Sequence, residues 1–156
     1  MNALTVLGIS SAVASALVGG VFFAFSTFVM RALAGMESSQ GVLAMQRINL
    51  AVINPWFLGV FLGTVPLLAI TALFARGDPH ALGWLLSAFV LYLVGSAGVT
   101  MAFNVPRNNR LAALEPASTE AATYWPAYAR EWLWWNHVRC ATSLLAAVAA
   151  ALAVAR

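Results

Sequence analysis

Residues 4 to 30 constrain the fold more than any other part of the chain, because none of them carries a charge. An α-helix of about 20 apolar residues is long enough to cross the hydrocarbon core of a bilayer. The segment has no positively charged region before it, and it is too long for the apolar part of a signal peptide. It therefore predicts a retained transmembrane helix.

The composition extends this conclusion to the whole chain. Hydrophobic residues make up 62% and charged residues 8% of the 156 residues, and the mean hydropathy is +0.86. A soluble domain carries about 25% charged residues, so this chain has too few to cover a water-facing surface. We expect an all-α integral membrane protein in which residues 1–156 form one four-transmembrane-helix bundle, with spans at about 4–30, 56–75, 81–103 and 133–155.

Residues 31–54, between the first two spans, are more polar than the spans themselves. A helix start is predicted at Ser38 or Ser39. The second half of the segment is weakly amphipathic, which is typical of a helix that lies at the membrane interface. We therefore expect an additional interfacial helix between spans 1 and 2.

Two prolines set the expected ends of the last connection. Pro106 predicts the end of the third span, because the residue before a proline disfavours the helical region. Residues 104–123 would then form a loop. Pro126 suits the first turn of the last helix.

The eight arginines, with no lysine, indicate orientation rather than nucleic-acid binding, since they are scattered and form no basic run. Six of them fall on the side of the two long connections, which the positive-inside rule places in the cytoplasm. We expect a polytopic protein of the cell (inner) membrane, in contact with the lipid bilayer, and a homo-oligomer is one open option for its assembly. The single Cys140 excludes an internal disulfide.

The stretch "REWLWWNHVRC", residues 130 to 140, places polar side chains at the start of an apolar helix. At about 100° per residue, Tyr128, Trp132, Trp135 and Arg139 share one face, with Asn136 beside it. His137 lies about 100° from Asn136, on the side away from Arg139. An ionisable residue in a membrane helix usually faces the bundle interior or a cavity. The pattern indicates a polar pocket centred on Asn136, while a snorkelling arginine in a tryptophan belt is the structural alternative.

Further amides belong to the same side of the membrane. "FNVPRNNR" supplies Asn104 and Asn108 at the end of the third span, and Asn49 comes from the interfacial segment. Loop and cap chemistry is the alternative, since asparagine favours turns. The two histidines, His80 and His137, lie on opposite sides, so no histidine and carboxylate set has metal-ligand spacing.

The segments "INLAVINPWF", "NVPRNN" and "WLWWNHVR" together resemble the anthrone oxygenase-like family of membrane proteins, and the resemblance covers nearly the whole chain. Fungal members are linked to the oxidation of anthrones to anthraquinones without a known metal or flavin. Arg107 stands where a more apolar residue is expected. The resemblance implies these signature positions: Asn104, Pro106, Asn108, Trp132, Trp135, Asn136, His137 and Arg139.

Such a reaction assigns roles to these residues. It needs a base, donors for an oxyanion and a dry pocket that admits O2. His137 is the expected base, being the only residue on this side with a pKa near neutrality. The expected oxyanion donors are Asn136, Asn104 and Arg139, and the expected substrate-binding residues are Trp132, Trp135, Asn108, Asn49 and Tyr128.

The main interpretation is thus a cofactor-independent monooxygenase acting on a lipophilic phenolic or anthrone-like compound and O2. A non-enzymatic small-molecule-binding or accessory membrane protein is the first alternative. A haem- or copper-binding membrane protein that uses His137 is the second.

Overall fold

The computed structural model describes residues 2–155, so residues 1 and 156 of the expected domain lie outside the described part. Within that part the regular elements are helices, with no strand. Three of them, labelled η, are π-helical segments with a wider turn than an α-helix. The elements are α1 Ala3–Ala24, η1 Phe25–Val29, α2 Met30–Ala34, α3 Ser38–Ala51, α4 Pro55–Phe74, α5 Pro79–Val90, η2 Leu91–Gly98, η3 Thr100–Asn104, α6 Val105–Ala112 and α7 Thr119–Leu152.

Three helices are long and apolar enough to cross a membrane, because the π-helical segments continue the helices around them. They are Ala3–Ala34, Pro55–Phe74 and Pro79–Ala112. The chain is therefore an integral membrane protein. The last helix, α7, is not among these three, since Asn136, His137 and Arg139 interrupt its apolar half.

Polar side chains before proline fix the start of two of these helices. Asn54 accepts a hydrogen bond from the Phe57 N–H at 3.0 Å, and Pro55 follows it as the first helical residue. Asp78 does the same for α5, with the Ala81 N–H at 3.2 Å. Such caps satisfy a backbone donor that the first helical turn leaves free.

The prediction that Pro106 ends the third helix is wrong. The N–H of Val105 bonds to the Thr100 carbonyl, five residues back, which closes the π-helical turn of η3. The wider turn leaves room for the proline ring, whose nitrogen has no hydrogen to donate. The helix therefore runs on through α6 to Ala112.

The predicted start of the last helix near Pro126 is also wrong. Ser118 accepts a hydrogen bond from the Ala121 N–H at 3.1 Å, and α7 begins at Thr119. Trp125 and Tyr128, on either side of the proline, are buried in a hydrophobic cluster that holds this part of the helix in place. The expected loop 104–123 is thus reduced to residues 113–118.

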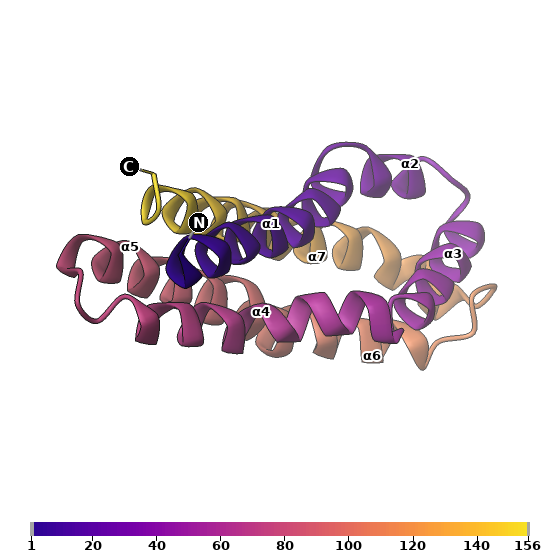
Figure 1. The fold of residues 1–156 in the computed structure, drawn as a ribbon. Helices are drawn as coiled ribbons and strands as arrows, with labels where there is room; N and C mark the ends of the chain where they lie inside the picture. The colour runs from indigo at the N-terminus through magenta and orange to yellow at the C-terminus, as the bar shows by residue number, and fades with distance from the viewer. Residues whose placement is uncertain (1, 156) are drawn as a thin grey trace.

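Figure 1 shows how the helices are arranged. α7 packs along α1 and α5, and α4 packs against both α1 and α5. The two ends of the described chain and the start of α5 lie at one end of the structure, and α2, α3 and α6 lie at the other (Figure 1). The two long connections therefore meet at one end of the molecule.

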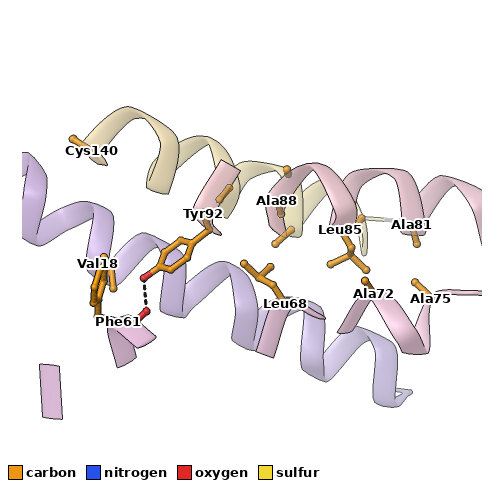
Figure 2. Packing of buried hydrophobic residues seen from close by; sticks show 14 of the residues in the cluster. Val18, Phe61, Leu68, Ala72, Ala75, Ala81, Leu85, Ala88, Tyr92 and Cys140 are labelled. Carbon is orange, nitrogen blue, oxygen red and sulfur yellow. Dashed lines mark hydrogen bonds between the residues drawn. The ribbon is translucent and has the colours of Figure 1, made fainter. Parts of the chain in front are cut away.

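The core at the first end is built from small and branched side chains. Leu68 of α4, with Ala81 and Leu85 of α5, is fully buried there, facing a run of buried alanines on α7. The Tyr92 hydroxyl donates to the Phe61 carbonyl at 3.0 Å, so the polar group of this buried ring is satisfied (Figure 2). A second cluster, at the other end, packs α3 and the start of α7 together.

Candidate functional site

Arg139 is the central side chain of the candidate site. It lies in α7 with 5% of its surface exposed. Its guanidinium donates to the Asn136 Oδ1 at 2.8 Å and to the Thr100 Oγ1 at 3.2 Å, both neutral acceptors. Among residues 2–155 no carboxylate pairs with it, and the ion pair that these residues form joins Arg107 to Glu131. Arg139 is therefore a buried cation without a counter-ion.

Asn136 is held in one orientation by α1 and η1. Its Nδ2 donates to the Phe22 carbonyl and to the Ser26 Oγ, each at 2.8 Å. The amide oxygen then points toward Arg139, three residues further along α7. Because the amide cannot turn over without losing two hydrogen bonds, Asn136 fixes the position of the guanidinium.

Two aromatic rings complete the surroundings of Arg139. Its Cζ lies 4.2 Å from the centroid of the Phe22 ring and 5.0 Å from that of Trp132. A cation over an aromatic face is stabilised by about 2 kcal/mol when it is desolvated. These contacts offset part of the cost of burial without neutralising the charge.

Arg139 lines a cavity of about 550 Å³. The wall comes from α1, η1, α3, α4, η3, α6 and α7, and most of its side chains are apolar. A volume of this size accommodates a drug-sized ligand. Its aromatic and aliphatic wall includes Phe22, Phe25, Phe57, Phe61 and Trp132.

A small set of amides faces the same cavity from α3 and α6. Asn108 accepts a hydrogen bond from the Tyr128 hydroxyl at 2.9 Å. Asn49 and Asn108 line the cavity, while Tyr128 stands behind them.

Asn104 acts on α7 from outside the cavity wall. It is buried, and its Nδ2 donates to the Trp132 carbonyl at 3.2 Å. This bond ties η3 to α7 directly beside the ring that contacts Arg139. The structure therefore places Asn104 as a support for Trp132.

The structure does not bring Trp135 or His137 to the cavity. The Trp135 ring stacks on Phe103, with the ring centroids 3.6 Å apart. His137 is exposed and forms no part of the cavity wall. Of the expected residues, the cavity thus brings together Arg139, Trp132, Asn49 and Asn108, with Asn136, Asn104 and Tyr128 directly behind them.

Sequence reasoning did not identify the contributions from α1 and η3. Phe22 and Ser26 hold Asn136, and Thr100 accepts from Arg139. These residues do not stand out in the sequence, because phenylalanine and hydroxyl side chains are common in membrane helices. Two π-helical segments, η1 and η3, supply residues to the site, and π-helical turns occur frequently at functional sites.

No group of three or more histidine, cysteine or carboxylate side chains that could hold a metal occurs among the described residues. His137 alone offers a nitrogen ligand near this end of α7.

The arrangement favours one kind of ligand. A cation in an apolar cavity stabilises a bound anion more strongly than it would in water. A weak acid that enters the cavity is therefore stabilised in its ionised form, and the apolar wall selects a lipophilic one.

A family model described as anthrone oxygenase matches residues 54–149. The chain belongs to the anthrone oxygenase family. The matched residues run from the start of α4 into the second half of α7, and they include Asn104, Asn108, Trp132, Asn136 and Arg139. Phe22, Ser26 and Asn49 lie before the matched range. No curated protein and no solved structure matches the chain significantly.

Proposed function

We propose that the protein crosses the membrane four times, with α7 as the fourth span and α3 as the interfacial helix. The close packing of α7 against α1 and α5 supports this topology, because it shields Arg139 from lipid. The two long connections would lie in the cytoplasm by the positive-inside rule. The membrane is proposed to be the cell (inner) membrane, and association of several copies is compatible with this arrangement.

We further propose that the protein is a cofactor-independent oxygenase of lipophilic phenolic or anthrone-like compounds. The observation that carries this proposal is the buried Arg139, which lines a largely apolar cavity without a counter-ion. Such a cation stabilises the oxyanion that forms when an anthrone loses a proton from its methylene carbon. The negative charge of that anion lies largely on the carbonyl oxygen, which is the atom proposed to face the guanidinium.

The ionised substrate is the species that reacts with O2. The electron-rich methylene carbon forms a bond to one oxygen atom, and protonation gives a hydroperoxide on that carbon. Loss of the remaining hydrogen as a proton and cleavage of the O–O bond release water and leave a second carbonyl. One anthrone and one O2 thus give one anthraquinone and one water, and no external reductant is required.

The reaction also needs an acceptor for the first proton. His137 is the candidate from the sequence, but its side chain is exposed and outside the cavity wall. The cavity itself offers Arg139 and neutral polar groups, among them Asn49 and Asn108. We therefore assign the main catalytic effect to stabilisation of the anion by Arg139, with His137 as a secondary candidate for accepting the proton.

The test is oxygen uptake by the purified protein in detergent after addition of 1,8-dihydroxyanthrone. Arg139→Gln is expected to lower turnover about 10²–10³-fold, the effect of removing one oxyanion donor. The matched control is Arg130→Gln, since Arg130 is exposed on the same helix, and full turnover is expected. Uptake by the wild-type protein no faster than the uncatalysed reaction would refute the oxygenase proposal.

A non-catalytic binding or accessory protein is the second candidate. It is favoured by one observation, that among residues 2–155 no histidine or carboxylate side chain lines the cavity. In that case the anthrone would bind and depend on Arg139, but oxygen uptake would not rise. A haem or copper protein using His137 is the third candidate, and visible absorption or bound metal lost in His137→Ala would support it.

A further inference from the structure

The cavity wall includes side chains that are also exposed on the outside of the molecule. Met101 of η3 is 63% exposed and Leu62 of α4 is 53% exposed, and both line the cavity. Each lies in a helix that is long and apolar enough to cross a membrane. An exposed residue in such a helix faces acyl chains, so these two residues join the cavity to the lipid.

The helices that carry these residues are not closely packed on each other along the cavity. α4 packs against α1, α5 and η2. Among the described residues it makes no extensive contact with η3 or α6. The side of α4 that faces η3 is therefore left open along the cavity.

We propose that the cavity opens sideways into the bilayer between α4 and η3, and that Met101 and Leu62 form this opening. A lipophilic aromatic ligand, dissolved in the membrane, reaches Arg139 through it without passing through water. The identity of the ligand rests on the proposed function. The opening itself rests on the exposure of Met101 and Leu62 and on the lack of close packing between α4 and η3.

The alternative route leads to water. At the end formed by α3 and α6 the cavity wall contains Gln46 and the exposed Asn109, which are polar. A ligand that arrived from the aqueous phase would pass these side chains. A small probe reaches the cavity from the lipid by the lateral route and from water by the other route.

The experiment uses a cysteine as the reporter and needs no substrate. The single native cysteine is removed as Cys140→Ala, and Val21→Cys places a thiol on the cavity wall with little change in volume. The protein is reconstituted in phosphatidylcholine vesicles and treated with N-cyclohexylmaleimide, which dissolves in the bilayer, or with a charged, membrane-impermeant maleimide. A second reporter, Leu17→Cys, is exposed on the outside of α1.

The proposal predicts that Met101→Trp slows modification of the Val21→Cys thiol by N-cyclohexylmaleimide about tenfold or more, because the ring fills the opening. Modification of the Leu17→Cys thiol is expected to stay unchanged. The matched control is Val94→Trp, since Val94 is 62% exposed on the same long helix but does not line the cavity.

Two results would overturn the lateral opening. One is an unchanged rate for the Val21→Cys thiol in Met101→Trp. The other is faster modification by the charged maleimide than by N-cyclohexylmaleimide, which would place the route at the Asn109 end. Neither result depends on turnover, so each experiment can refute the lateral opening or the oxygenase proposal without refuting the other.

Discussion

Replacing Arg139 by glutamine separates the functional and structural roles of the buried cation. The substitution removes the charge and keeps a polar side chain of similar shape. It breaks the hydrogen bonds to Asn136 and Thr100 and the contacts with Phe22 and Trp132. We expect a large loss of turnover and a small change in stability.

The magnitudes follow from the contacts of the guanidinium. Burial of an unpaired cation costs several kcal/mol. The two hydrogen bonds, each made by a charged donor, return about 1.5–3 kcal/mol each. The two aromatic contacts add about 2 kcal/mol or more. These contributions nearly cancel, so removing Arg139 is expected to change the free energy of unfolding by less than about 2 kcal/mol.

The effect of the substitution on turnover is separate from its effect on stability, because the anion is present only in the reacting complex. Loss of one oxyanion donor costs about 2.7–4 kcal/mol, or about 10²–10³-fold in rate. The assay compares oxygen uptake and thermal unfolding of Arg139→Gln in the same detergent, with Arg130→Gln as the control. An Arg139→Gln protein that unfolds easily but retains its turnover per folded molecule would refute this reasoning and make Arg139 structural.

Three further substitutions test neighbouring parts of the structure. Asn136→Asp places a carboxylate against the guanidinium and is expected to abolish oxygen uptake while the protein stays folded, as measured by thermal unfolding; normal uptake would contradict the role of an unpaired cation. Trp132→Ala is expected to weaken binding of 1,8-dihydroxyanthrone at least about tenfold, and Trp135→Ala to leave it unchanged, in a fluorescence titration; equal effects would place both rings at the ligand. Gly95→Ala puts a Cβ against the Thr142 side chain of α7 and is expected to cost about 1–3 kcal/mol of stability, whereas Gly63→Ala, with nothing within 4 Å, should cost less; equal melting temperatures would contradict the tight packing of η2 on α7.

The sequence predicted the helical class, the membrane location and the family, because these depend on hydropathy and on a local motif. The starts of α4 and α5, at Pro55 and Pro79, lie close to the expected span starts at 56 and 81, and in both a capping residue and its proline are adjacent in the chain. The continuation of helices through Pro106 and Pro126 was not readable. It depends on a π-helical turn in one case and on burial against another helix in the other.

In the candidate site, too, local relations were predictable and contacts between distant parts of the chain were not. The relation of Asn136 to Arg139 follows from helical spacing within α7, and their hydrogen bond is local. The orientation of Asn136 depends on Phe22 and Ser26, more than a hundred residues away in the chain. Helical spacing also placed His137 on a different face of α7 from Arg139. That the His137 side chain lies outside the cavity is seen only from the residues that line the cavity.

The hydrogen bonds from Asn136 to α1 also bear on how the protein is made. α7 is synthesised after the other described helices, and its polar residues make it the least suited of the long helices to enter the bilayer alone. An arginine at the centre of a span adds about 2.5–3.5 kcal/mol to the cost of insertion. The acceptors and rings that accommodate Arg139 lie on α1, η3 and α7 itself. With α7 as the proposed fourth span, its insertion would be coupled to its docking on α1, and the cavity would be complete only once α7 has docked.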